Sequence, residues 1–299
     1  MIPKIIHQLW IGDKSKKPQR IMDMWKDMNP EFTYYCWDEK MIEEKLTINK
    51  RYKFKIENHE AIWGKADMYR WLILKEYGGI FIDADIIPIE PLDDDLLMRP
   101  FVCYEQEEER QGLLATSVQA YPPNHILPNT SIEWIMNNNV NETRTKTASW
   151  ILVGPGLLTR SYETLKQKNI ENCIDIKPSY TFLPDHHTGK RYLGHGKVYA
   201  THEWGSTRNN YKQISKMLLP DHFTKPSHKN NITIDLTNIN HKHFDNCLNS
   251  IKNMEGRYNI LLHYNNDDDK RQYLLKWVKN TRWITIYSTI QGEVSGTEI

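Results

Sequence analysis

The sequence predicts an α/β fold in which a sheet is built from successive β–α–β units. Over residues 1–85, apolar or aromatic stretches alternate with segments of helical spacing, and turn residues separate them. Such alternation is typical of a sheet whose strands are joined by covering helices. A chain of 299 residues is also long enough to form a large core without disulfides.

The first elements are predicted at the N-terminus. Residues 5–10 are mostly apolar and end before Gly12, which indicates a strand followed by a turn. Residues 20–28 have helical character, and Pro30 ends this segment because proline disfavours a helical residue before it. Residues 32–37 are aromatic and typical of a second strand.

The clearest helix is predicted over residues 59–77, where apolar side chains recur near helical spacing. The glycine pair 78–79 ends it, as a left-handed cap would. Residues 80–82 then form a short apolar strand that leads into the acidic triplet 83–85.

Later elements suggest two domains. The sequence predicts strands at 101–104 and 198–203, helices at 129–138 and 155–168, and a loop at 185–196. The polar stretch 225–231 indicates a linker, so we expect one domain over residues 1–225 and a small α/β unit over 228–299. The elements predicted in that unit are strands at 232–236, 258–263 and 283–287 and helices at 241–253 and 269–279.

Composition excludes several classes of protein. The chain has 39 Lys+Arg and 38 Asp+Glu, and this balance excludes a strongly basic nucleic-acid binder. Its 4 cysteines lie far apart, which argues against a zinc ribbon or a disulfide framework. The N-terminus lacks the order of a signal peptide, and no apolar run reaches the roughly 18 residues of a membrane span. We therefore expect a cytoplasmic protein without a transmembrane segment.

Asp83 and Asp85 follow an apolar strand with one residue between them. In extended chain, residues two apart point to the same side, so both carboxylates can face one cation. The carboxyl end of a strand is also where open α/β sheets bind ligands. Oxygen ligands suit Mg²⁺ or Mn²⁺, and either ion would neutralise a pyrophosphate leaving group. A chance pair is the alternative, but burying two carboxylates is costly without a cation.

Other polar groups are interpreted as solvated. The acidic runs 93–95 and 267–269 lie in polar turns. Adjacent histidines usually diverge, so we expect His186 and His187 to have a surface or acceptor-loop role and not to bind a metal. The sequence contains no glycine-rich phosphate loop and no nucleophile elbow.

Three motifs occur in order: residues 5–12 (IIHQLWIG), 65–70 (KADMYR) and 74–85 (LKEYGGIFIDAD). Together they resemble the DXD-containing sugar transferases of glycosyltransferase family 32. They are more distantly similar to the glucosyltransferase domains of large clostridial toxins. Residues 154–156, 180–184 and 201–206 agree more loosely. The resemblance covers roughly residues 1–210.

This resemblance implies a GT-A fold, a Rossmann-like nucleotide-sugar-binding fold. It also implies a nucleotide-sugar donor, a divalent ion such as Mn²⁺, and retention of configuration at the anomeric carbon. By matching position, Asp83 and Asp85 are the metal and donor pair, with Asp85 the more direct ligand. Asp67 and Arg70 lie on one helix face. The resemblance implies that they bind the donor sugar, with Arg70 also near the phosphates. A helix-surface ion pair is their alternative.

The resemblance gives roles to further residues. Trp10 matches the position that stacks on the nucleotide base, and Phe81 matches a donor-contacting tyrosine but has no hydroxyl. His202 matches a third metal ligand, and Trp204 and Ser206 match a loop that contacts the diphosphate. Ser206 is followed by threonine where family members often have tryptophan. A core tryptophan and a surface histidine are the alternatives for Trp10 and His202.

Together with these residues, the resemblance implies a retaining transferase that moves a hexose to a hydroxyl of a glycan, lipid or protein. A UDP-sugar is the preferred donor, and GDP-mannose is the second choice. The alternatives are another metal-dependent nucleotide-sugar enzyme (a hydrolase or nucleotidyltransferase) and a non-catalytic sugar-binding module. In the tail, residues 243–251 faintly resemble the first helix of family 2 glycosyltransferases. The tail is therefore either the start of a second such domain or a small C-terminal subdomain.

Overall fold

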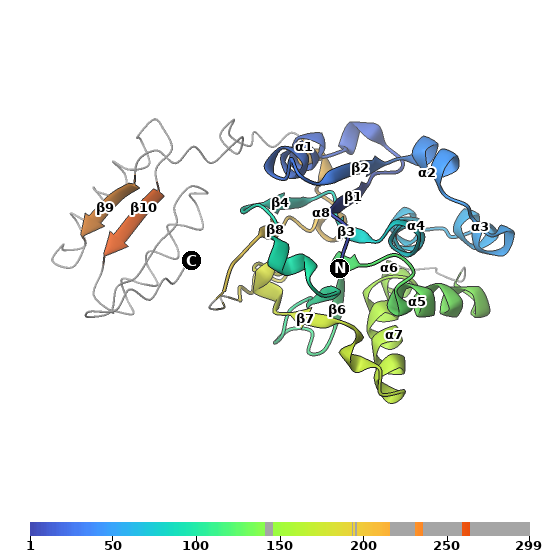
Figure 1. Cartoon of the computed structure of the whole chain (residues 1–299). Helices are drawn as coiled ribbons and strands as arrows, with labels where there is room; N and C mark the ends of the chain where they lie inside the picture. Colours follow the sequence, from blue (N-terminus) through green and yellow to red (C-terminus); the bar gives the residue numbers. More distant parts are fainter. Residues whose placement is uncertain (141–145, 193, 195, 216–230, 236–258, 264–299) are drawn as a thin grey trace. The chain divides into compact units, whose positions relative to one another are not determined.

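The computed structural model describes residues 1–140, 146–192, 194, 196–215, 231–235 and 259–263 (Figure 1). The chain divides into two compact units, residues 1–194 with 198–224 and residues 195–197 with 225–299. The predicted boundaries at 225 and 228, and the identity of the tail, stay predictions.

The described part of the second unit is a pair of parallel strands, β9 (Asn231–Asp235) and β10 (Asn259–His263). They confirm the strands predicted at 232–236 and 258–263. The elements predicted at 241–253, 269–279 and 283–287, and the acidic run 267–269, lie outside the described residues.

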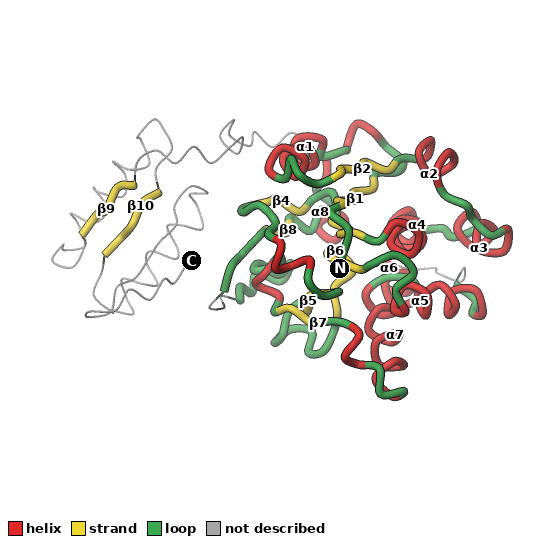
Figure 2. The backbone as a smooth tube through the Cα atoms, viewed as in Figure 1, coloured by secondary structure: helices red, strands yellow, loops and turns green. Residues whose placement is uncertain are grey.

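A mixed sheet forms the centre of the first unit (Figure 2). Its strands are β1 (Ile5–Leu9), β2 (Thr33–Trp37), β3 (Gly79–Ile82), β5 (Phe101–Tyr104), β6 (Leu114–Tyr121) and β7 (Asp175–Lys177). They lie in the order β2-β1-β3-β6-β5-β7. β1 runs parallel to β2 and β3, whereas β6 is antiparallel to β3 and β5. The predicted α/β class is confirmed.

Both faces of this sheet are covered. The helices of the first unit are α1 (Gln19–Met28), α2 (Glu39–Lys45), α3 (Lys50–Glu57), α4 (Ile62–Tyr77), α5 (Ile126–Asn137), α6 (Lys146–Leu152), α7 (Pro155–Gln167), α8 (Gly205–Arg208) and α9 (Tyr211–Ile214). Phe81 packs with α4, α5 and α7 on one face, and Ile80 and Ile82 pack with α1 on the other. Successive strand residues point to opposite faces, so an uninterrupted apolar run suits a strand covered on both sides.

The sequence predicts many of these elements to within a few residues, but not β6, β7, α2, α3, α6, α8 or α9. β6 is missed because Thr116, Ser117 and Gln119 interrupt its apolar pattern, although the whole strand is buried. The sequence also predicts only one of the two strands of a second, small sheet. This sheet pairs β4 (Ile86–Pro88) with β8 (Ala200–His202), of which only β8 falls within a predicted strand.

The glycine pair after α4 has a different role from the predicted left-handed cap. Gly78 has φ 62° and ψ −148°, so its φ is positive but its ψ lies outside the left-handed helical region. Gly79 also has a positive φ, and a Cβ there would lie 2.6 Å from the carbonyl oxygen of Ile5. The pair therefore allows β3 to approach β1 closely.

Among the described residues, no helix combines the length and apolarity that a bilayer crossing requires. The expected cytoplasmic location stays a prediction.

His7 lies on β1, between β2 and β3, and is fully buried. Its Nδ1 accepts a hydrogen bond from the indole N–H of Trp37 (3.0 Å), so its Nε2 carries the proton and donates to the carbonyl oxygen of Gly78 (2.8 Å). Burial lowers the pKa of His7 to about 4, although the bond to Gly78 opposes the shift. The folded protein therefore holds His7 neutral.

We predict that His7 makes the fold sensitive to acid. The unfolded chain binds a proton at His7 below about pH 6.5, and the folded chain does so only near pH 4, so stability falls as pH drops between these values. From pH 7.5 to pH 5, wild type should lose about 2 kcal/mol more unfolding free energy than His7→Gln. Urea titrations of both proteins at the two pH values measure this. Equal losses would contradict it.

Candidate active site

The acidic pair, Asp83 and Asp85, lies in the short connection between β3 and β4. The backbone N–H of Asp83 donates to the carbonyl oxygen of Ser117 on β6 (2.9 Å), which fixes the end of β3. β4 pairs with β8 so that Ile86 lies opposite His202. This pairing brings a residue from the far end of the unit beside the acidic pair.

Asp83, Asp85 and His202 form a compact group of possible ligands. Each offers one atom, and these atoms lie within 4.8 Å of one another. His202 Nε2 lies 3.3 Å from Asp85 Oδ2, which also accepts the backbone N–H of Gly205 at 2.6 Å. His202 is therefore buried beside the pair, and the alternative of an ordinary surface histidine is wrong.

Two atoms in this group are buried and have no hydrogen-bond partner: Asp85 Oδ1 and His202 Nδ1. A buried polar atom without a partner is costly in a folded protein. Carboxylate oxygens together with an imidazole suit Mn²⁺, and the carboxylates suit Mg²⁺. The residues present therefore fit a divalent cation.

The charges within the group are strongly coupled. Burial by itself would raise the pKa of Asp85. His202 and the backbone N–H of Gly205 lower this pKa by a larger amount, so it lies below its ordinary value. Burial lowers the pKa of His202, but Asp85 and Asp83 raise it above its ordinary value. Asp85 is thus held as a carboxylate.

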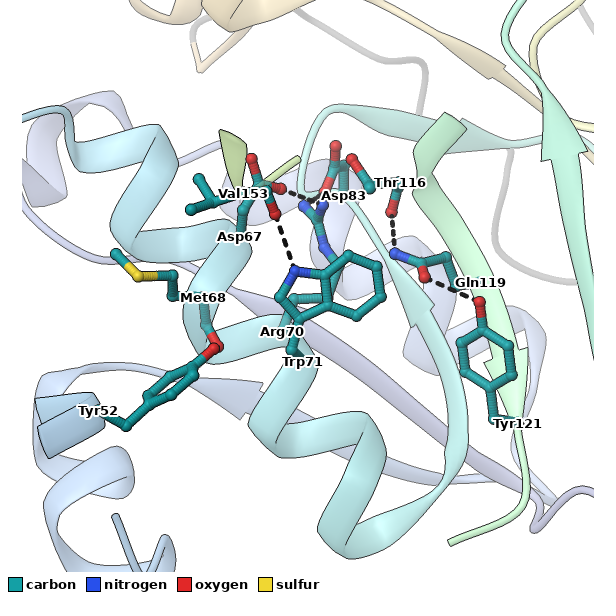
Figure 3. A network of polar contacts seen from close by, with 10 residues as sticks. All are labelled: Tyr52, Asp67, Met68, Arg70, Trp71, Asp83, Thr116, Gln119, Tyr121 and Val153. Atoms are coloured by element: carbon teal, nitrogen blue, oxygen red, sulfur yellow. Dashed lines mark hydrogen bonds and ion pairs between the residues drawn. The ribbon is translucent and has the colours of Figure 1, made fainter. Parts of the chain in front are cut away.

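Asp67 and Arg70 extend this group along α4 (Figure 3). One guanidinium nitrogen of Arg70 donates to Asp67 and the other to Asp83. Asp67 and Arg70 are buried, so the alternative of a helix-surface ion pair is wrong. The guanidinium also lies 4.7 Å from the ring centre of Phe81, which gives Phe81 a packing contact with the site.

Asp67 is supported from β6 and lies close to Gly154, the residue before α7. The Thr116 side chain hydrogen-bonds to it, and Thr116 in turn accepts from Gln119 through its carbonyl oxygen (3.0 Å; Figure 3). Burial raises the pKa of Asp67 to about 6, against the opposing charge of Arg70. A Cβ at Gly154 would lie 2.6 Å from Asp67 Oδ2, so glycine is required for this close approach.

Burial also raises the pKa of Asp83, and the nearby Asp85 adds to the shift, while Arg70 opposes it. Among the side chains of Asp67, Asp83 and Asp85, that of Asp83 is the most accessible, with 27% exposed.

Trp10 lies at the end of β1, half-buried, so it is not an ordinary core tryptophan. Its ring meets Tyr211 of α9 edge to face, with centroids 4.9 Å apart. Burial and the charges of Asp85 and Asp83 raise the pKa of Tyr211 well above its ordinary value, which keeps it a neutral phenol beside the acidic pair. Tyr211 is not predicted from the sequence, because no motif marks it and only the fold brings α9 to this site.

Trp204 and Ser206 differ in their relation to the site. Trp204 is buried, has the left-handed φ of 56°, and its ring centroid lies 4.2 Å from that of His202. Ser206 is exposed on α8, next to Gly205. The structure thus places Trp204 against the site and leaves Ser206 at its surface.

The expected surface position of His186 is wrong, whereas the acceptor-loop role stays a prediction. His186 is fully buried, and the rings of His186 and His187 lie 4.0 Å apart, beside Glu105. The two side chains lie close together in a tight turn over residues 184–192, for which the sequence predicts only a loop.

We predict that Arg70 offsets a large repulsion between buried carboxylates. Replacing it by leucine leaves Asp67 and Asp83 unpaired, so Arg70→Leu should lower the unfolding free energy by about 3–5 kcal/mol at pH 8. The matched control is Lys53→Leu, which removes an exposed ion pair with Glu57 and should change stability by less than about 1 kcal/mol. Urea unfolding measures both, and equal effects would contradict the prediction.

Comparison with known proteins agrees with the resemblance predicted from the motifs. Residues 15–102 match a family model described as glycosyltransferase sugar-binding region containing DXD motif. Asp67, Arg70, Asp83 and Asp85 lie inside this match, and Trp10, His202, Trp204 and Ser206 lie outside it.

Three relatives are similar over part of their length. Mannosyl phosphorylinositol ceramide synthase SUR1 of Saccharomyces cerevisiae is 34% identical over 28% of this chain and 23% of its own. Inositol phosphoceramide mannosyltransferase 3 of Schizosaccharomyces pombe is 33% identical over 28% and 24%. The initiation-specific alpha-1,6-mannosyltransferase of Candida albicans is 28% identical over 40% and 33%. The chain thus spans at most a third of the length of these relatives.

Among solved structures, the PaToxG glycosyltransferase has a TM-score of 0.42 at 20% identity, covering 57% of this chain and 72% of that one. The catalytic domain of alpha-toxin from Clostridium novyi has a TM-score of 0.37 at 9% identity, covering 72% and 74%. Both scores are low, and no conclusion about activity rests on them.

Proposed function

We propose that this protein is a metal-dependent glycosyltransferase that moves a hexose from a nucleotide-sugar to a hydroxyl group, with retention of configuration. One observation carries this proposal. Asp83, Asp85 and His202 lie close together, Asp85 and His202 each have a buried atom without a hydrogen-bond partner, and the buried ion pair Asp67–Arg70 lies next to them. The match of residues 15–102 to a DXD sugar-transferase model supports it.

Asp85, Asp83 and His202 would hold the cation, Mn²⁺ or Mg²⁺. When bound, it would offset the negative charge of the departing nucleoside diphosphate. Asp85 suits this role best, because one of its oxygens is unpartnered and its lowered pKa keeps it charged.

The other residues would position the donor. Asp67 has carboxylate oxygens suited to sugar hydroxyls, and Arg70 fixes its orientation. Trp10 offers an aromatic surface for the base. Trp204, the residue before α8, and Ser206, in its first turn, would contact the diphosphate. Catalysis would then come mainly from positioning and from electrostatic stabilisation of the leaving group.

The donor is proposed from the relatives. The resemblance to family 32 leaves UDP-sugars as the first choice and GDP-mannose as the second, but the names of the three relatives all refer to mannose. These names favour GDP-mannose as the first donor to test. Two of the names also refer to an inositol phosphoceramide, which favours a lipid-linked hydroxyl among the glycan, lipid and protein acceptors.

We predict that Asp85→Asn abolishes transfer while the protein stays folded. The amide keeps the shape of the side chain but loses the charge that would hold the cation, so activity should fall by at least about 100-fold. The control is Asp27→Asn, which removes an exposed carboxylate on α1 and should leave activity unchanged. The measurement is nucleotide release from GDP-mannose and a panel of UDP-sugars with Mn²⁺, repeated with EDTA.

The products of this panel separate the alternatives. Nucleoside diphosphate released faster with an acceptor supports a transferase, whereas release independent of any acceptor indicates a hydrolase. Pyrophosphate formed from a nucleoside triphosphate and a sugar phosphate indicates a nucleotidyltransferase. Donor binding without turnover indicates a sugar-binding module. Full activity of Asp85→Asn would overturn the metal assignment.

We further predict that Trp10 contributes to donor affinity. Stacking of a base on an aromatic ring contributes about 1–3 kcal/mol, so Trp10→Ala should raise the donor KM by about 5- to 150-fold, with a smaller change in kcat. Trp10→Phe keeps an aromatic face and should retain most of the affinity. Steady-state kinetics with the best donor of the panel test this, and an unchanged KM in Trp10→Ala would contradict it.

A further inference from the structure

Glu105, His186 and His187, here called the loop cluster, form a second group of possible ligands. Glu105 follows β5, and the two histidines lie in the turn over residues 184–192. One ligand atom from each residue lies within 4.8 Å of the others. Glu105 and His186 are buried, and His187 is half-buried. The cluster shares no residue with the acidic pair and His202.

The distances within the loop cluster suit a shared cation better than a direct hydrogen bond. His186 Nε2 lies 3.4 Å from Glu105 Oε1, which is long for a hydrogen bond between these groups. Two ligands on a tetrahedral Zn²⁺ lie about 3.3 Å apart, given bonds of about 2.0–2.1 Å. The rings of His186 and His187 have centroids 4.0 Å apart with an interplanar angle of 42°, so they converge.

The turn that carries the histidines is held in place by its own hydrogen bonds. The backbone N–H of His186 donates to the carbonyl oxygen of Lys190 (2.8 Å), and that of Gly189 donates to His186 (2.9 Å). Thr188 Oγ1 lies 2.9 Å from His186 Nδ1 and accepts a hydrogen bond from it in the tautomer that carries the proton on Nδ1, whereas the backbone N–H of Thr188 lies farther from this nitrogen, at 3.4 Å. A metal-binding histidine commonly donates its other ring N–H in this way, which fixes the ligating nitrogen.

The charge of Glu105 is only weakly compensated by the described side chains around it. The Nε atom of Arg110 lies 3.9 Å from Glu105 Oε1, and the Arg110 side chain is 38% exposed. A buried carboxylate needs a closer cation than this to offset its loss of hydration.

We propose that the loop cluster binds a transition-metal cation, with Zn²⁺ as the best fit. Two imidazoles and one carboxylate are an established zinc ligand set, which leaves one position for water. The same donors are poor ligands for Mg²⁺, which prefers oxygen. This proposal does not rest on transferase activity.

The bound ion would position Trp204. The Trp204 ring meets both histidines edge-on, at 5.1 Å and 5.2 Å, and its indole N–H donates to the carbonyl oxygen of Asp185 (2.7 Å). The Trp204 ring also lies against the ring of His202, with centroids 4.2 Å apart. The ion would thus have a structural role: it would fix the turn against Trp204, and Trp204 would in turn support His202 beside the acidic pair.

The test uses the untagged full chain after removal of metals. Asp85→Asn serves as the background, so that the acidic pair does not compete for the probe. We expect this protein to bind one equivalent of Zn²⁺ in equilibrium dialysis and to give the visible absorption of tetrahedral Co²⁺ when Co²⁺ is the probe. Adding Glu105→Gln or His187→Ala should weaken binding at least 10-fold and remove the absorption.

A second measurement does not depend on the ligand variants folding. X-ray absorption of the Zn²⁺-loaded Asp85→Asn protein should show two imidazole ligands at about 2.0–2.1 Å. Either of two results for the Asp85→Asn protein would overturn the proposal: no binding of Zn²⁺, or an X-ray absorption spectrum without imidazole ligands. The proposal is also overturned if the folded Glu105→Gln and His187→Ala proteins both bind Zn²⁺ as tightly as the Asp85→Asn protein does. Loss of transfer activity in Asp85→Asn has no bearing on these outcomes.

Discussion

Arg70 joins α4 to the end of β3 by contacting Asp67 on its own helix and Asp83 on the strand end. Without this guanidinium, two carboxylates would lie close together in a buried place, where like charges repel strongly and one of them would take up a proton. Burial raises the pKa of Asp67 to about 6 even with Arg70 present, so the guanidinium only partly offsets the cost of burying this carboxylate. The rest of the site is arranged around this pairing.

The second requirement is the return of the late segment to the acidic pair. β8 pairs with β4, and this places His202 and the N–H of Gly205 against Asp85, while Tyr211 follows on α9. Trp204 contacts the rings of both His186, in the proposed zinc site, and His202, beside the acidic pair. Two ligand clusters and one tryptophan therefore share a single packed region.

Prediction from sequence succeeds where one local signal is strong. α4 and β3 are predicted because periodicity, a glycine stop and an apolar run all agree. β6 is not predicted, because its polar Ser117 and Gln119 are buried by neighbours that no local pattern reveals. The helices α2 and α3 are short, and their stability depends more on packing than on propensity.

The sequence by itself determines the α/β class, the acidic pair at the end of a strand, and the placing of Asp67 and Arg70 on one helix face. These follow from spacing within a single strand or helix. Only the tertiary structure decides that Arg70 pairs with Asp83, that His202 and Tyr211 reach the acidic pair, and that His186 and His187 converge on Glu105. Those contacts join residues far apart in the chain. Sheet pairing and the turn over residues 184–192 bring these residues together, and neither can be predicted from the spacing of residues within one element.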